Sequence, residues 1–295
     1  MRRHDTCARA LLALAALAIL LPASGSATSR KLQVFGLTAD QQLIRFREDR
    51  ARSHRAVGPI TNLSGDTGLV GIDFRPANGA LYALGNAGGI YTLDVETAEA
   101  TFVSQLNVNG APLALAGASF GVDFNPTVDR LRVVSDTGQN LRINVDTGAA
   151  TVDGGLNFPG VAPAPATPAT GVTAVAYTNN DADAATGTTL FDLDSANDQV
   201  VIQLPPNAGT LTPTGKLTVG GLDVAPDGGF DIWSDVDKSG RSVAVRALAA
   251  LTTDASRLYE IDLLTGQATS LGKFRSDTQV IGIAIELDQN RPTPK

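Results

Sequence analysis

Cysteine is almost absent from this chain of 295 residues, and the only one, Cys7, lies close to the N-terminus. Removal of residues 1–27, which have the pattern of an export signal, leaves a chain without cysteine. A disulfide, a thiolate nucleophile and a cysteine-ligated metal site are then excluded. A chain of this length can instead be held together by the burial of its core alone.

Histidine and positive charge are also scarce. His54 is the only histidine after residue 27, which argues against zinc and non-haem iron sites, because these need two or three imidazoles. The formal net charge of −7 argues against nucleic acid or an anionic membrane as the main partner, since both require clustered positive charge. No cofactor is indicated.

No hydrophobic run is long enough to cross a membrane. The apolar run Ala10–Leu21 would span roughly 18 Å as a helix, short of the ~30 Å hydrocarbon core. It follows Arg2, Arg3 and Arg9 and precedes small residues that end at Ala27, as in a secretory signal peptide. We therefore expect a signal peptide over residues 1–27, and a single secreted or periplasmic domain over 28–295 with no membrane anchor.

An internal repeat of about 50 residues is the strongest pattern that is present. Segment 71–101 aligns with 121–151 without a gap, with about ten identities in roughly thirty positions. The Gly-x-Asp-x-x-Pro motif of these segments recurs at Gly221–Pro226. A period of this length indicates a propeller or a solenoid.

Each repeat predicts four short strands separated by turn residues. In the second copy we expect them at Phe120–Phe124, Arg130–Ser135, Asn140–Val145 and Ala150–Leu156. Asn-Pro and Asp-Thr-Gly sequences between them are turn signals. A weaker third unit starts near Thr173, and the next is expected to start at Gly221.

The two ends of the chain complement each other. Val280–Ile285 resembles a first strand with no successor, whereas Leu32–Leu37, Gln42–Arg47 and His54–Val57 resemble later strands without a first one. Together they complete a fifth unit. The sequence therefore predicts an all-β protein, a β-propeller of five four-stranded blades closed by pairing of the N- and C-terminal strands.

Two segments depart from the regular pattern. Pro159–Thr170 has the composition of a linker, but the repeat continues beyond it, so we expect a long exposed loop between two blades. Gly240–Leu251 fits either a helix or a strand.

Several motifs are similar to one bacterial family. The most specific is Phe124–Arg142 (FNPTVDRLRVVSDTGQNLR), and further matches are 34–38, 71–76, 176–180 and 205–211. These motifs extend over about Lys31–Leu287 and resemble the family of domain of unknown function 4394. The resemblance implies a secreted or periplasmic β-propeller-like domain of uncharacterised activity, and it supplies no catalytic residues.

Two motifs of known chemistry have weak support. Gly117–Gly121 matches the G-x-S-x-G of a hydrolase nucleophile, but it leads into a predicted strand and has no suitable histidine base. Asp235, Asp237 and Ser239 begin like a calcium loop, yet Arg246 stands where a bidentate glutamate is needed. A polar hairpin tip is favoured, and calcium binding at this loop stays open.

The charged run Arg45–Arg55, which contains His54, predicts a solvated hairpin loop.

Three aspartates, Asp73, Asp123 and Asp223, share one repeat position. In the innermost strands they could line the central channel and hold a cation. However, a residue that recurs in successive blades usually serves the blade, and an aspartate just before a proline-led turn can accept that turn's backbone N–H groups. We therefore expect a structural role, with no metal ligand and no catalytic residue among them.

Three arginines have no counterpart in the preceding repeat. Arg130, Arg132 and Arg142 align with Ala80, Tyr82 and Thr92. If Asp136–Gly138 forms a three-residue hairpin loop, Arg132 lies opposite Arg142, which is unfavourable unless a negative group lies between them.

Two partners for these guanidinium groups remain open. Internal pairing with a carboxylate such as Asp73 or Asp123 is favoured. The alternative is an anionic ligand, which makes Arg130, Arg132, Arg142 and Asp123 the candidate ligand-binding residues.

Together these patterns favour an exported, non-enzymatic and monomeric propeller. Its partner would be a small anionic or carbohydrate ligand or an extracytoplasmic protein, bound through loops on one face. The alternative is a hydrolase or lyase that acts on sugars or lactones, with catalytic carboxylates drawn from Asp73, Asp123, Asp223 and Glu286 at the channel.

Overall fold

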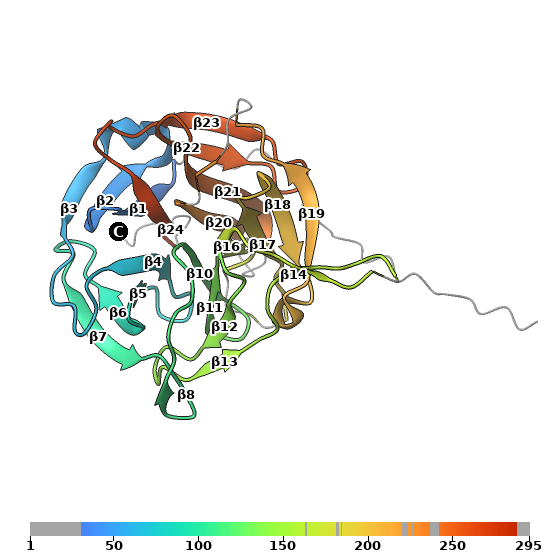
Figure 1. Ribbon diagram of the computed structural model, residues 1–295. Helices are drawn as coiled ribbons and strands as arrows, with labels where there is room; N and C mark the ends of the chain where they lie inside the picture. The colour runs from blue at the N-terminus through green and yellow to red at the C-terminus, as the bar shows by residue number, and fades with distance from the viewer. Residues whose placement is uncertain are drawn as a thin grey trace, which may run out of the picture.

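The computed structural model describes residues 31–162, 164–180, 183, 185–219, 224–225, 227–236 and 242–287. The predicted signal peptide over residues 1–27 lies outside the described residues, as do Asp223, Asp237 and Ser239. Five four-stranded antiparallel sheets are arranged around a central axis (Figure 1). The predicted five-bladed propeller is confirmed.

The four strands of each blade follow one another from the axis outward. The first blade contains β24 (Val280–Ile285), β1 (Gln33–Thr38), β2 (Gln42–Arg47) and β3 (Arg55–Pro59). The second contains β4 (Leu69–Phe74), β5 (Leu81–Gly85), β6 (Gly89–Leu93) and β7 (Ala100–Gln105). The third contains β10 (Phe120–Asn125), β11 (Arg130–Ser135), β12 (Asn140–Ile143) and β13 (Ala150–Val152).

The remaining two blades have the same order. The fourth contains β16 (Val172–Tyr177), β17 (Leu190–Asp194), β18 (Gln199–Gln203) and β19 (Leu211–Lys216). The fifth contains β20 (Gly228–Val236), β21 (Ser242–Thr252), β22 (Ser256–Ile261) and β23 (Ala268–Lys273). Short elements complete the described structure: η1 (Glu48–Ser53), η2 (Pro206–Ala208), β8 (Asn107–Val108), β9 (Ala111–Pro112), β14 (Asn157–Phe158) and β15 (Thr167–Pro168).

The first blade is assembled from both ends of the chain. β24 pairs antiparallel with β1, with Ile285 opposite Val34 and Ile283 opposite Gly36. In Figure 1 the red β24 lies beside the blue β1. This pairing confirms the predicted closure, in which strands from both ends of the chain complete one blade.

Hydrophobic packing holds neighbouring blades together. The buried apolar side chains form five clusters, and each one takes its members from two adjacent blades. For example, Phe191 of the fourth blade and Phe230 of the fifth belong to one cluster. Since the alternating side chains of a strand point to both faces of its blade, each blade contributes to two clusters.

Glycine lets the innermost strands approach one another closely. Gly71, Gly121, Gly229 and Gly282 stand in four of these strands and line a narrow part of the channel together. A Cβ added at Gly121 would meet the backbone of Ala174 at 2.7 Å. A side chain at Gly121 would therefore force neighbouring blades apart.

The fifth blade differs from the sequence prediction. Its innermost strand begins at Gly228 rather than at Gly221, so Gly229-Phe230-Asp231-Ile232 matches Gly71-Ile72-Asp73-Phe74. The ambiguous segment Gly240–Leu251 contributes to strand β21. The motif at Gly117–Gly121 leads into strand β10, as expected, and not into the helix that a hydrolase nucleophile requires.

The long segment between the third and fourth blades forms a small hairpin. β14 pairs with β15, and Asn157 forms an isolated bridge to Thr210 next to β19. The predicted loop between two blades is therefore present, and it contacts the blade that follows. Among the described residues, no helix has the length and hydrophobicity needed to cross a bilayer.

Candidate functional site

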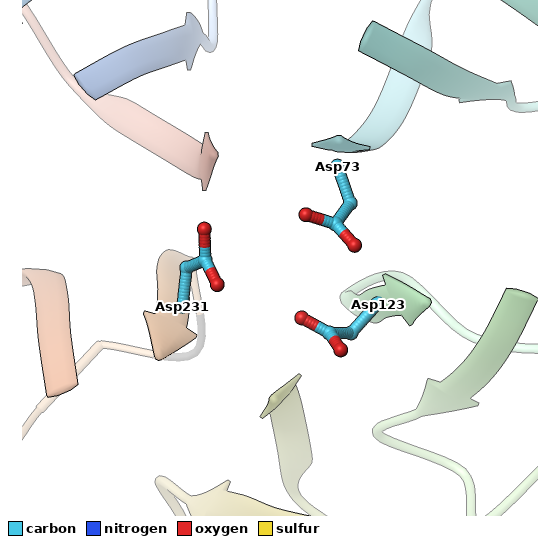
Figure 2. A group of neighbouring side chains, drawn as sticks. All are labelled: Asp73, Asp123 and Asp231. Atoms are coloured by element: carbon cyan, nitrogen blue, oxygen red, sulfur yellow. The ribbon is translucent and has the colours of Figure 1, made fainter. Parts of the chain in front are cut away.

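Three carboxylates from three different blades meet at the axis. Asp73 lies on β4, Asp123 on β10 and Asp231 on β20, and one oxygen of each lies within 4.8 Å of the others. Figure 2 shows the three side chains pointing toward one another. They are 4–7% exposed. We call Asp73, Asp123 and Asp231 the axial carboxylates.

Each axial carboxylate also joins its own blade to the next one around the ring. Oδ2 of Asp73 accepts the N–H of Phe124 at 2.7 Å, and Oδ1 of Asp123 accepts the N–H of Tyr177 at 3.0 Å. Oδ2 of Asp231 accepts the N–H of Ile285 at 2.5 Å. The axial aspartates thus accept backbone N–H groups, as expected. However, the N–H groups belong to the innermost strand of the next blade and not to the proline-led turn.

Burial and mutual repulsion disfavour the charged form of these groups. Burial is the main cause that raises the pKa of Asp73 well above its usual range, and the charge of Asp231 raises it further. The pKa of Asp123 is raised by burial and then by the charges of Asp73 and Asp231. Burial raises the pKa of Asp231 to about 7, although the N–H of Ile285 lowers it.

Sequence reasoning missed Asp231 and named Asp223 in its place. The available signal was Gly229-Phe230-Asp231-Ile232, which repeats the Gly-apolar-Asp-apolar pattern without the proline that follows it in the other copies. In the other two blades, alanine occupies the position of the axial aspartate. Ala176 comes directly before Tyr177, and Ala284 comes directly before Ile285, just as Asp123 comes before Phe124. The site is therefore built by three of the five innermost strands. Glu286, the other carboxylate named for catalysis, is not part of this group.

The axial carboxylates suit a cation that prefers oxygen ligands. Calcium and magnesium bind carboxylates, whereas zinc sites in proteins usually contain histidine or cysteine. Neither residue type belongs to this group of three. Pairs of carboxylates about 5 Å apart also serve acid–base chemistry in glycosidases, provided that a substrate can reach them.

The predicted arginine site is organised around a different carboxylate. Arg132 lies opposite Arg142 in the β11–β12 register, as predicted, and Asp153 lies between them. Asp153 Oδ2 accepts a bond from each arginine at 2.7 Å, and its Oδ1 accepts another from Arg142 at 2.9 Å. The carboxylate partner is therefore Asp153, and not Asp73 or Asp123 as the sequence suggested.

Arg132 is enclosed by protein. It is 1% exposed, and its other bonds go to Asn140 at 2.7 Å, Asn207 at 2.9 Å and Tyr177 at 3.3 Å. Asn207 and Tyr177 belong to the fourth blade region, so Arg132 joins two blades. The geometry is that of internal pairing, the alternative that the sequence favoured.

The other candidate binding residues are not brought to this cluster. Arg130 donates to the backbone carbonyls of Asp129 at 2.8 Å and Val128 at 3.4 Å. Asp123 lies opposite Arg132 in the β10–β11 register, but its carboxylate belongs to the axial group. Of the four predicted ligand-binding residues, only Arg132 and Arg142 therefore bind a common carboxylate.

Arginine–carboxylate ion pairs recur at other blade boundaries. Arg75 of the second blade binds Asp129 and Asp146 of the third at 2.6 and 2.7 Å. Arg246 of the fifth blade binds Glu48 at 2.6 Å, and Glu48 is 1% exposed. These arginines were not identified from the sequence, because their partners lie in other repeats.

The predicted solvated loop around His54 is correct for most of the charged run, since Arg47, Asp49, Arg50, Arg52 and Arg55 are exposed, but it is wrong for Glu48 and His54. Residues Glu48–Ser53 form the 3-10 helix η1, and His54 is 5% exposed. Nε of Arg275 donates to Nε2 of His54 at 3.1 Å. Burial is the main cause that lowers the pKa of His54. The segment packs against β23, which explains why its charged sequence does not face water as a whole.

A small hollow marks one mouth of the channel, where the innermost strands begin. Its lining includes residues from all five innermost strands or their approaches: Leu69, Phe120, Thr173, Gly228 and Ile281. Asp227 and Ser119 supply polar groups there. Oδ1 of Asp227 accepts the hydroxyl of Ser119 at 3.2 Å, and its Oδ2 accepts Nε2 of Gln279 at 3.2 Å.

Solved structures with similar folds are distant. A structural genomics protein of unknown function from Bacteroides thetaiotaomicron has 15% identity and a TM-score of 0.44, with 83% of this chain and 59% of that one covered. An auxiliary nutrient binding protein from the same organism has 14% identity and a TM-score of 0.38, with 73% and 55% covered. The chain thus spans less than two thirds of the length of either protein. Likeness at this level carries no information about function.

Comparison at the sequence level gives a clearer result. No curated protein sequence matches significantly. A family model described as domain of unknown function (DUF4394) matches residues 42–284. This match covers most of the chain, including four whole blades and most of the composite one. The protein therefore belongs to the DUF4394 family.

Proposed function

We propose that the protein is a non-enzymatic binding module that acts outside the cytoplasm and takes a hydroxyl-rich ligand, such as a sugar, at the channel mouth. The observation that carries this proposal is the carboxylate of Asp227 in the mouth hollow. Two hydrogen bonds, from Ser119 and Gln279, orient it. A carboxylate held in this way keeps free lone pairs that can accept further hydrogen bonds from ligand hydroxyl groups.

The charges favour a neutral ligand over an anionic one. Asp227 would repel a carboxylate or a sugar acid, whereas a hydroxyl group can donate to it. Arg132, which the sequence suggested for an anion, has its guanidinium bound to Asp153, Asn140 and Asn207. The rigid ring of blades provides a fixed scaffold for such a site.

Thermal shift and calorimetry with neutral sugars and with organic acids test this function. We expect sugars to raise the Tm of the wild type, and Asp227→Asn to lose most of that rise. Asp277→Asn is the matched control, because Asp277 is an exposed carboxylate in the segment that leads to β24. A rise with organic acids alone, or an unchanged sugar response in Asp227→Asn, contradicts the proposal.

A hydrolase or lyase is the second candidate, and the convergence of the axial carboxylates favours it. Their pKa values are raised, as acid–base catalysis often requires. Against it, each is at least nine-tenths buried and accepts a backbone N–H group. Turnover of aryl glycosides or lactones by the wild type, lost in Asp123→Asn, would establish this activity in place of binding alone.

Export is part of the proposal and rests on the pattern of residues 1–27. The expected mature N-terminus is Thr28, found in the periplasmic or secreted fraction of a bacterial host. N-terminal sequencing of the protein from that fraction is the test. A chain that keeps Met1 and remains in the cytoplasm would contradict export.

A further inference from the structure

The separation of the axial carboxylates is small enough for one calcium coordination sphere. Calcium lies about 2.3–2.6 Å from its oxygen ligands, so two ligand oxygens of one ion are at most roughly 5.2 Å apart. One oxygen from each of Asp73, Asp123 and Asp231 lies within 4.8 Å of the others. We propose that these three carboxylates bind one calcium ion on the axis of the propeller.

An unpartnered oxygen of Asp123 points independently to a ligand at this position. Oδ1 of Asp123 accepts the N–H of Tyr177, but no residue that the structure describes donates a hydrogen bond to Oδ2. The side chain is 4% exposed. In Figure 2 one of its oxygens points across the axis toward Asp231. A carboxylate oxygen that accepts no hydrogen bond from the protein keeps its lone pairs available for a group on the axis.

When the axial carboxylates are ionised, their electrostatic environment favours a positive charge on the axis. The side-chain charges that raise the pKa values of Asp73 and Asp123 are those of the other axial carboxylates. Three carboxylates this close would repel one another strongly in a buried site. A divalent cation offsets most of this repulsion without rearranging any side chain.

The hydrogen bonds at the site are compatible with metal binding. An ionised carboxylate has about four lone-pair positions, so an oxygen that accepts one N–H can also bind a cation. The N–H groups of Phe124, Tyr177 and Ile285 fix the orientation of the three ligands before the ion arrives. Calcium tolerates irregular geometry and completes its sphere with water, whereas magnesium demands a near-octahedral site at shorter distances.

The ion would join two adjacent blades to a third blade that is not adjacent to either of them. Asp73, Asp123 and Asp231 belong to the second, third and fifth blades. A cation bound by all three carboxylates would link the fifth blade, which adjoins the closing blade, to the second and third blades across the ring. It would therefore act on the stability of the whole ring, and it does not depend on a ligand at the channel mouth.

Calcium titration of protein stripped with a chelator tests the proposal. We expect calorimetry of the full mature chain to give one ion per chain, with a rise in Tm of several degrees. Asp123→Asn and Asp231→Asn should bind calcium at least about tenfold more weakly, because each removes a charged ligand. Without calcium, both variants should be at least as stable as the wild type, since asparagine still accepts the N–H bond and no longer repels its neighbours.

Asp262→Asn is the matched control. Asp262 also accepts backbone N–H groups, those of Leu264 and Thr265, but it lies in an exposed turn of the fifth blade. This variant should bind calcium like the wild type. The proposal is overturned if the wild type binds no calcium at millimolar concentration, if Asp123→Asn and Asp231→Asn both bind it unchanged, or if Asp262→Asn loses binding to the same extent.

Discussion

The carboxylate of Asp231 accepts the backbone N–H of Ile285 at 2.5 Å, and this bond joins the fifth blade to the strand that closes the ring. Ile285 itself lies opposite Val34 of the N-terminal strand β1. One buried side chain is therefore linked to both ends of the chain through a single strand. The same aspartate takes part in the axial group, so closure of the ring and the charge at its centre are coupled.

Two substitutions at Asp231 separate its hydrogen bond from its charge. Asp231→Ala leaves the buried N–H of Ile285 without an acceptor and should lower the free energy of unfolding by about 1–3 kcal/mol. Asp231→Asn keeps an acceptor and removes one of three converging charges, so in the absence of calcium it should be neutral or stabilising. Urea unfolding in the presence of a chelator measures both. Equal losses in the two variants would show that the charge matters and the hydrogen bond does not.

Stability should depend on pH through four buried carboxyls. The pKa values of Asp73, Asp123 and Asp192 are raised well above the usual range, and that of Asp231 is raised to about 7, chiefly by burial. A carboxyl group whose pKa is higher in the folded than in the unfolded protein stabilises the fold fully at a pH below its unfolded pKa of about 4. This stabilisation is lost as the pH rises through the pKa of the group in the folded protein.

The metal-free protein should therefore resist urea better at pH 5 than at pH 8. Saturating calcium should reduce this difference, because it offsets the repulsion among the ionised axial carboxylates. Urea midpoints at several pH values, with and without calcium, provide the measurement. A metal-free protein that becomes more stable from pH 5 to pH 8 would contradict these assignments.

Arg132 should be structurally essential. Arg132→Ala leaves Asn140 and Asn207 without a buried donor and removes one of the two arginines on Asp153. We expect a loss of about 3–5 kcal/mol in the free energy of unfolding. Arg130→Ala is the control and should cost less than about 1 kcal/mol, since the hydrogen bonds that Arg130 makes within the described part of the chain go to carbonyl groups one and two residues away. Similar losses for both would argue against the internal pairing of Arg132.

The native Asp192 side chain should lower the free energy of unfolding of the wild type. It is fully buried on β17, and neither of its carboxylate oxygens has a hydrogen-bond partner among the described residues. Its neighbours across the sheet are Val175 and Val201. Asp192→Val should therefore raise the free energy of unfolding by about 1–3 kcal/mol.

The neighbouring Asp194 provides the contrast for this prediction. It accepts bonds from Asn197 and Gln199, so Asp194→Val should destabilise the protein. Chemical unfolding of the two variants at pH 7 distinguishes the positions. A large loss of stability in Asp192→Val would mean that this carboxylate binds a group of its own.

Much of the fold follows from local patterns in the sequence. The repeat of Gly71–Pro76 at Gly121–Pro126 predicted the blades, and the complementary ends predicted the closing pair of β24 and β1, because strand alternation and turn residues are local signals. The register that places Arg132 opposite Arg142 was also predicted, from the turn Asp136–Gly138 alone. These features need only a few consecutive residues.

The candidate site depended on contacts that no local pattern contains. The convergence of Asp73, Asp123 and Asp231 arises only when the ring closes, and the copy of the motif at Gly221 concealed the strand that begins at Gly228. Asp153 could not be named as the partner of Arg132, because its position depends on where β13 ends. The burial of His54 likewise depends on packing against β23, which follows it by more than 200 residues.

Anomalous diffraction from crystals grown with calcium chloride tests the central claim most directly. We predict one calcium peak on the propeller axis, within about 2.6 Å of an oxygen from each of Asp73, Asp123 and Asp231, and no such peak in crystals of Asp123→Asn. An axis without a calcium peak in the wild type, in crystals that contain saturating calcium, would contradict the account.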